Sequence, residues 1–111
     1  MVADEGDADR IFHALADPTR RDILARAIRA EQSVSALARH YPISLAAVQK
    51  HVVVLERAAL VVKQRRGREQ VVHVDMAVLR RATRLLDAFE QLWRHRAHGI
   101  AQILAEDREG K

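Results

Sequence analysis

Four cationic side chains surround a single glycine, Gly67, in the second half of the chain. They are Lys63, Arg65, Arg66 and Arg68. Lysine and arginine gathered at the tip of a loop can hold phosphate groups through charge-assisted hydrogen bonds. A charged run is usually only a solvated surface, but β-branched residues precede and follow this one, which predicts a hairpin that presents the cations together. We therefore favour a phosphate-rich polyanion as the partner of this segment.

A second candidate binding surface follows Ser44, which is a predicted helix N-cap. A helix from there through about residue 58 places Val48, Val52 and Leu55 on one apolar face. The residues that then point outward, or lie at the edge of that face, are Ser44, Leu45, Ala46, Gln49, Lys50 and His51. In a DNA groove, glutamine can pair with adenine, lysine with guanine or a phosphate, and small apolar side chains with a thymine methyl group. The same residues would suit an ordinary solvent-facing helix, and His51 suits half-buried packing better than base contact.

The elements around this helix have the spacing of a helix-turn-helix. Ser33 is expected to cap a short helix that ends before Pro42, because the residue before a proline is pushed out of helical geometry. The helix that begins at Ser44 follows after only a few residues. Further upstream, Asp17 is expected to cap another helix, since a proline stands directly after it at the first helical position.

The sequence therefore predicts a mainly α fold with a small β-hairpin, of the winged helix-turn-helix type. Strands are expected over residues 62–66 and 70–74, and Gly67 allows the turn between them. Four helices precede this hairpin, and one long helix capped by Asp75 follows it.

The last predicted helix has an apolar stripe that one small domain cannot cover. Apolar residues recur at steps of three and four from Leu79 to Leu104, over about seven turns of ~5.4 Å each. Packing against a second copy of the chain explains this length better than packing within one chain. The predicted contacts between two copies are Ile11, Phe12, Leu85, Leu86, Phe89, Leu92, Trp93 and Ile100. The domains expected along the chain are a disordered acidic tail over 1–8, a winged helix-turn-helix DNA-binding core over 9–75 and a dimerisation helix over 76–107.

Composition limits the function further. The chain has 111 residues, enough for one domain, and a formal net charge of +4 that suits a polyanionic partner. It has no cysteine, which excludes disulfides and thiolate metal sites. No apolar run approaches the ~20 residues needed to cross a bilayer, so we expect a cytoplasmic protein without a membrane partner.

Catalysis and metal binding have little support in the sequence. No glycine-rich phosphate loop is present, and no nucleophile has a base at a diagnostic spacing, so we expect neither an enzyme nor a bound cofactor. His95 and His98 share a helix face near Asp87 and Glu90, and two copies of the chain could together offer four histidines to zinc. Scattered histidines produce such a pair by chance, so we expect no metal site and keep a zinc- or nickel-responsive protein as an alternative.

Residues 12–24, FHALADPTRRDIL, closely resemble the opening signature of the ArsR/SmtB family of bacterial transcriptional regulators. The resemblance continues through SVSALA at 33–38, VQKH at 48–51 and RRGR at 65–68. It implies a homodimeric winged-helix repressor that binds operator DNA and is often released by a small effector.

Two departures from the family bear on its metal sites. Members that sense arsenite or soft metals usually carry cysteines in the third helix, where this chain has Ser33 and Ser35. Thr83 and Arg84 occupy the region where metal-binding partners of a later histidine pair would stand. The resemblance therefore implies the branch without recognised metal ligands, with an effector that the sequence does not identify.

The leading hypothesis is a dimeric regulator that binds double-stranded DNA in a sequence-specific way, most simply a repressor on a palindromic operator. An alternative from a different class is a winged-helix interaction module whose last helix docks another protein. The same apolar stripe motivates both hypotheses, so the oligomeric state of the chain discriminates between them.

Overall fold

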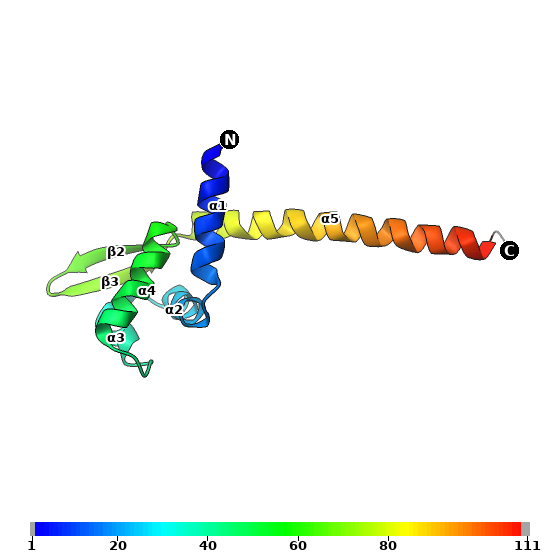
Figure 1. Cartoon of the computed structure of the whole chain (residues 1–111). Coiled ribbons are helices and arrows are strands. Elements are labelled where there is room, and N and C mark those ends of the chain that lie inside the picture. Colours follow the sequence, from blue (N-terminus) through cyan, green and yellow to red (C-terminus); the bar gives the residue numbers. More distant parts are fainter. Residues whose placement is uncertain (1, 110–111) are drawn as a thin grey trace.

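The computed structural model describes residues 2–109 of the 111-residue chain. Five helices and three strands lie within these residues, with the helix-turn-helix formed by α3 and α4 and the wing by β2 and β3 (Figure 1). Their bounds are α1 Val2–Leu15, α2 Pro18–Arg29, β1 Gln32–Ser33, α3 Val34–Ala38, α4 Leu45–Arg57, β2 Val61–Arg66, β3 Glu69–Val74 and α5 Met76–Glu109. The winged helix-turn-helix order predicted from the sequence is thus confirmed.

Four helices begin at the polar residues that the sequence predicts as their caps. These N-caps are Asp17, Ser33, Ser44 and Asp75. In each case a side-chain oxygen accepts a hydrogen bond from a backbone amide two or three residues later, at 2.9 to 3.4 Å. Each cap satisfies an amide that has no partner within the helix, which explains why the helix starts there.

The register of the wing follows from its turn. β2 and β3 pair antiparallel up to Arg66 opposite Glu69, which leaves Gly67 and Arg68 as a two-residue turn. Gly67 has a φ of 61°, a conformation that glycine adopts without steric cost in such tight hairpin turns. Both strands begin one residue earlier than the sequence predicts.

A third strand, β1, is not predicted by the sequence. Gln32 and Ser33 pair antiparallel with β3, so the sheet order is β1-β3-β2. The sequence indicates Ser33 only as a helix cap, and in the structure it serves both as a cap and as a strand residue. Two residues are too few for an alternating pattern, so no local signal reveals this strand.

The core lies where the first four helices meet the sheet. Its largest fully buried side chains are Ile11, Ile23, Leu37, Val48, Val52, Leu55, Leu60, Val61 and Val72. Apart from Leu60, which lies between α4 and β2, they come from all four of these helices and from both strands of the wing, so burial of apolar surface fixes the wing against the helix-turn-helix. The apolar side predicted for α4 is confirmed, because all three of its members are in this set.

The first residues differ from the prediction. The sequence predicts a disordered tail over 1–8, whereas α1 begins at Val2, and residue 1 lies outside the described residues. The helix extends toward the N-terminus because its later turns are fixed by the buried Ile11, and adding residues to an existing helix is easier than starting one. A carboxylate oxygen of Asp7 also lies 3.2 Å from a guanidinium nitrogen of Arg81 on α5. The expected tail is therefore corrected to helix.

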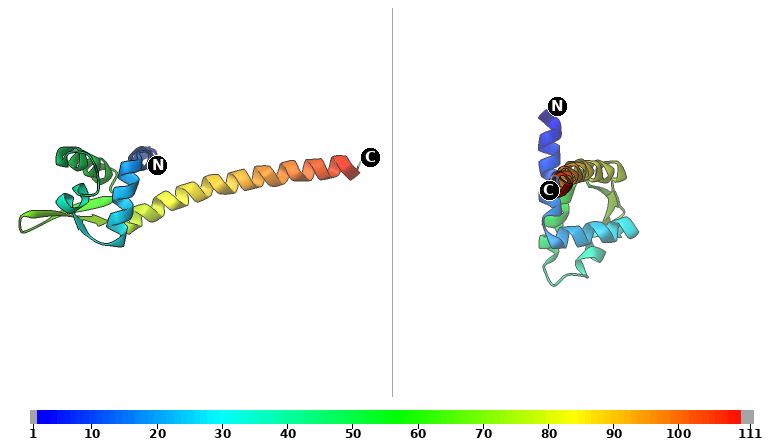
Figure 2. Two further views of the ribbon diagram at one scale, coloured as in Figure 1. Left: turned by 90° about the horizontal axis from the view of Figure 1, so that it is seen from below. Right: turned by 90° about the vertical axis from the view of Figure 1, so that its right-hand side faces the viewer.

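The last helix, α5, leaves the body of the molecule as a long arm (Figure 1 and Figure 2). It has 34 residues, and the molecule measures 74 × 34 × 21 Å along its principal axes. The radius of gyration is 19.9 Å, against about 13 Å for a compact domain of this length. Only the start of α5 is packed, with Ala82 buried and Val78 and Leu79 against the core. Among the described residues, no helix is both long and apolar enough to cross a membrane.

Candidate nucleic-acid interface

Helix α4 separates buried residues from exposed ones. Val48, Val52 and Leu55 are fully buried in the core. The opposite side is exposed and carries the predicted reading residues Ser44, Leu45, Ala46, Gln49 and Lys50. Base contact requires such a side, because residues in the first turns of a helix in the major groove meet the base edges.

This outer side of α4 is longer than the sequence prediction, which ends at His51. A shallow hollow along it is lined by Ala46, Gln49, Lys50, Val53, Val54 and Arg57. Arg57 is exposed in the last turn of α4 and follows Lys50 and Val53 at steps of seven and four, which places all three on one side of the helix. That spacing is a sequence signal from which Arg57 could have been predicted.

The cations of the wing lie on two different faces. Successive residues of a strand point to opposite faces, so Lys63 and Arg65 share one face while Arg66 lies on the other. The Lys63 face turns toward α4, because the Lys63 amine lies 3.6 Å from the Glu56 carboxylate. A cleft between the wing and α4 is lined by Val34, Gln49, Val52, Val53, Lys63 and Gln70. The structure therefore brings two predicted residues, Lys63 and Gln49, to one surface.

Arg66 is bound on the face of the wing that points away from α4. Its Nη1 donates to Glu31 Oε2 at 2.5 Å, and its Nη2 lies 3.3 Å from His73 Nε2. His73 Nδ1 lies 3.2 Å from the other carboxylate oxygen of Glu31, so a neutral imidazole protonated on Nδ1 satisfies all three contacts. The structure thus separates Arg66 from the other predicted phosphate ligands.

Arg65 and Arg68 are exposed at the tip of the wing. Arg65 Nε donates to the Gly67 carbonyl at 3.2 Å, which holds the arginine close to the turn. Arg68 occupies the second position of the turn itself. Both guanidinium groups lie in solvent, where a phosphate can approach them without first displacing a buried partner.

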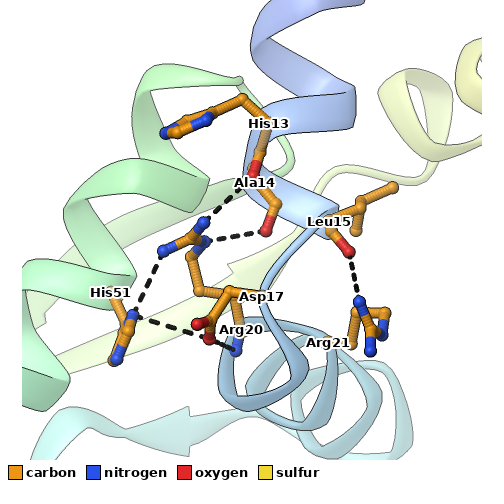
Figure 3. A network of polar contacts seen from close by, with 7 residues as sticks. All are labelled: His13, Ala14, Leu15, Asp17, Arg20, Arg21 and His51. Atoms are coloured by element: carbon orange, nitrogen blue, oxygen red, sulfur yellow. Dashed lines mark hydrogen bonds and ion pairs between the residues drawn. The ribbon is translucent and has the colours of Figure 1, made fainter.

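His51 belongs to a polar network between α4 and the corner that joins α1 to α2 (Figure 3). Arg20 donates from Nε to the Ala14 carbonyl at 2.8 Å and from Nη2 to the His13 carbonyl at 3.0 Å. Its Nη1 lies 3.4 Å from His51 Nδ1, and the same imidazole nitrogen is 3.9 Å from Asp17 Oδ2. The backbone amide of Arg20 lowers the pKa of the Asp17 carboxyl below its ordinary value. The imidazole, with its side chain 24% exposed, is half-buried, as the sequence favours.

Tyr41, which the sequence did not indicate as important, fixes the turn between α3 and α4. Its hydroxyl donates to Asp22 Oδ2 on α2 at 2.5 Å, and Arg26 Nε donates to the same oxygen at 2.8 Å. The Arg26 guanidinium also lies 6.0 Å from the centre of the tyrosine ring, within cation–π range. Burial, together with the hydrogen bond to Asp22, raises the pKa of Tyr41 to about 12. This cluster fixes the turn that leads into α4.

The apolar stripe of α5 is exposed along the arm. Leu86 is 55% exposed, Phe89 64%, Leu92 67%, Trp93 63% and Ile100 47%, while Leu85 is half-buried. On α1, Phe12 is half-buried, but Ile11 is only 1% exposed within the single subunit. The prediction of Ile11 as a contact between two copies is therefore corrected, because its side chain is already used by the subunit's own core.

The histidine pair predicted as a weak metal candidate lies on the exposed part of α5. His95 and His98 are both exposed. Within the described part of the chain, no group of three or more histidine, aspartate or glutamate side chains in one subunit is arranged to hold a metal ion.

A helix pair with an exposed reading side, next to a hairpin with cations at its tip, defines a winged helix-turn-helix protein. Residues 15–64 match a helix-turn-helix domain family. The chain is 38% identical over 102 residues to the HTH-type transcriptional regulator Rv2034 of Mycobacterium tuberculosis, which covers 92% of this chain and 91% of that protein. It therefore belongs to the ArsR family of helix-turn-helix transcriptional regulators.

Solved structures agree with this assignment. An ArsR-like transcriptional regulator from Rhodococcus sp. RHA1 is 34% identical, with a TM-score of 0.80, and the match covers 96% of this chain and 97% of that one. A homodimeric winged helix-turn-helix DNA-binding domain, Mb0332 from Mycobacterium bovis, has the same fold at 23% identity, with a TM-score of 0.68 and coverage of 85% and 88%.

Proposed function

We propose that this protein is a dimeric regulator that recognises a roughly palindromic operator and represses transcription by occupying it. The observation that carries the proposal is the division of α4, whose inner side is fully buried while its outer side is exposed next to the wing. Base edges would meet Gln49 and Lys50, and phosphates would meet Arg65 and Arg68. Such a regulator acts where bacterial DNA lies, which is the cytoplasm.

The exposed stripe of α5 supports pairing with a second copy. Fully burying a large apolar side chain contributes about 1.5–3 kcal/mol, so side chains that are about half to two-thirds exposed each stand to gain roughly half of this or more. Seven such side chains lie on the arm: Leu86, Phe89, Leu92, Trp93, Ile100, Ile103 and Leu104. Their combined contribution is of the order needed to offset the roughly 4–15 kcal/mol that association costs. The homodimeric state of Mb0332 is in line with this pairing.

Symmetry then sets the form of the DNA site. A two-fold dimer presents two α4 helices that enter successive major grooves when they are about 34–36 Å apart, so the two half-sites would be inverted copies one helical turn apart. A protein bound in this way lowers transcription by excluding the polymerase from the DNA it covers. A small effector that weakens this binding would release the operator.

A DNA-binding titration tests the proposal. Binding of the full chain to the DNA upstream of its own gene and to a scrambled duplex would be measured by fluorescence anisotropy over a range of salt concentrations. We expect Gln49→Ala to reduce discrimination between the two duplexes, since a bidentate base contact is worth about 1–3 kcal/mol. We expect Arg68→Ala to weaken binding to both duplexes equally and to lower the salt slope by about 0.9.

Arg29, at the end of α2, provides a matched control. It is an exposed arginine that lines neither the hollow along α4 nor the cleft between α4 and the wing. Arg29→Ala should therefore leave both discrimination and salt slope unchanged. Unchanged binding by the Gln49 and Arg68 variants as well would contradict the proposed reading surface.

A second function, docking of a different protein by α5, is motivated by the same exposed stripe. Light scattering of the purified chain separates the two proposals. A dimer that prefers its own upstream DNA supports the regulator, whereas a monomer without sequence preference supports the interaction module.

A further inference from the structure

The exposed side of α4 does not end at the residues proposed to meet base edges. Ala46, Lys50, Val53 and Arg57 follow one another at steps of four, three and four, so they form one ridge along the helix. The hollow along α4 includes all four of them. A cation, Arg57, therefore stands at the C-terminal end of the same side that is proposed to enter the groove.

A second cleft continues from this ridge onto α1. It is lined by Arg10 and His13 of α1 and by Val54, Arg57 and Ala58 at the end of α4. Val54 and Arg57 belong to both the cleft and the hollow, so the two form one continuous surface. The wing contacts α4 on its other side, through Glu56 and Lys63. The helix is thus flanked by cations on both sides.

The charge balance of this second cleft is positive. A neighbouring cleft shares Arg10 and Arg57 with it and adds Arg81 and Asp7. Asp7 lies 3.6 Å from Arg10 and 3.2 Å from Arg81 in this neighbouring cleft, whereas the second cleft itself is lined by Arg10, His13 and Arg57 without an acidic side chain among the described residues. The Arg10 side chain is 65% exposed, which leaves it accessible to a second anionic partner.

We propose that Arg10 and Arg57, with His13 beside them, form a second phosphate-binding site, which we call the inner clamp. An α-helix with its side chains is about 10–12 Å wide and nearly fills a major groove about 12 Å wide, so its two sides face the two phosphate backbones of that groove. The wing would contact one phosphate backbone and the inner clamp the other. The inner clamp deepens the proposed function and rests on it.

The position of the inner clamp predicts which phosphates it contacts. The wing lies on the side of α4 away from α5, and α1 lies on the side toward α5 (Figure 1 and Figure 2). In a dimer joined through α5, the inner clamp therefore faces the DNA between the two half-sites, and the wing faces its outer flanks. Phosphate-ethylation interference should show contacts on both sides of each half-site, with those between the half-sites lost in the Arg10→Gln, Arg57→Gln double variant.

Salt dependence of DNA binding gives a quantitative test on the dimer of the 111-residue chain. Each phosphate contact contributes about 0.9 to the slope of log K against log salt concentration, so each single variant should lower the slope by about 0.9 and the double variant by about twice as much. The loss should be equal on operator and scrambled duplexes, because phosphate contacts do not carry sequence information. Arg57→Lys should keep the wild-type slope, and Arg29→Gln serves as the matched control.

The outcomes separate this inference from the proposed function. If the wild type shows no preference for any operator, the proposed function fails and the inner clamp fails with it. If the wild type prefers its operator and Arg68→Ala lowers the slope, but Arg10→Gln and Arg57→Gln do not, only the inner clamp is overturned. Circular dichroism shows whether each variant is folded, and light scattering shows whether it is dimeric. If Arg57→Gln on α4 unfolds, the salt slope of Arg10→Gln on α1 tests the inner clamp by itself.

Discussion

Replacing Tyr41 by phenylalanine removes one hydroxyl group and tests the tie between the helix turn and α2. The hydroxyl donates to Asp22, whereas the aromatic ring, which Arg26 covers, is kept in the variant. The change therefore isolates a single hydrogen bond to a carboxylate that also binds Arg26. Its loss should lower the stability of the whole fold, because this hydrogen bond attaches the turn before α4 to α2.

The structure sets both the size and the pH dependence of the effect. Burial, which disfavours the tyrosinate, is the larger cause of the rise in the pKa of Tyr41 to about 12, and the hydrogen bond to Asp22 is the next, so the loss of that bond alone should cost about 1 kcal/mol. Because the folded-state pKa is raised, the contribution of Tyr41 is complete below the unfolded value near 10 and is lost as the pH rises toward 12. The stability advantage of the wild type over Tyr41→Phe, which does not titrate at this position, should therefore shrink as the pH rises above 10.

Two measurements check this prediction. Urea unfolding at neutral pH should show Tyr41→Phe to be less stable by about 1 kcal/mol, the typical net worth of one hydrogen bond. The chain has one tyrosine, so the ultraviolet absorbance of tyrosinate follows Tyr41 alone, and its midpoint should lie above 10 in the folded protein and near 10 in urea. A native midpoint at the ordinary value, together with an equally stable phenylalanine variant, would refute the assigned role of the hydroxyl.

Three further predictions follow from single positions. The fluorescence of Trp93, the one tryptophan, should shift to shorter wavelength as dimers form on raising the protein concentration, and Leu92→Glu should abolish the shift because it places a charge in the apolar stripe. Ser44→Ala should cost about 1 kcal/mol in urea unfolding through loss of the α4 cap, with Ser44→Thr as the conservative control. Leu55→Ala should cost roughly 2–5 kcal/mol as a core cavity, and a smaller loss would mean that the α4 inner side is loosely packed.

The features that the sequence predicted well are local ones. Each helix cap needs only a polar residue and an amide two or three positions away, and Ser44 illustrates this with a bond to the amide of Ala47. The wing was equally predictable, because Gly67 lies between two β-branched runs and supplies the positive φ of the turn. The outer side of α4 followed from the helical period once its first residue was known.

The features that the sequence did not reveal depend on contacts between distant positions. Tyr41 meets Asp22 across 19 residues, and Arg66 meets Glu31 across 35, so no spacing rule points to either pair. The apolar period of α1 indicated that Ile11 lies on a buried face of the helix. It did not show whether that face packs against the same subunit or against a second copy. The structure shows that the cover is the subunit's own core.

In the proposed dimer, the joint between the wing and α5 would couple DNA contact to pairing of the two subunits. Strand β3 ends at Val74 and α5 begins at Met76, so Asp75 alone separates them. Asp75 is fixed on both sides, because its amide donates to the Leu60 carbonyl at 2.9 Å and its carboxylate caps α5. With only one fixed residue between them, α5 cannot rotate without moving the base of β3, and the wing moves with it. In the proposed dimer, a change in how two α5 helices pack would therefore alter the position of both wings on the DNA, although no residue of α5 touches a base.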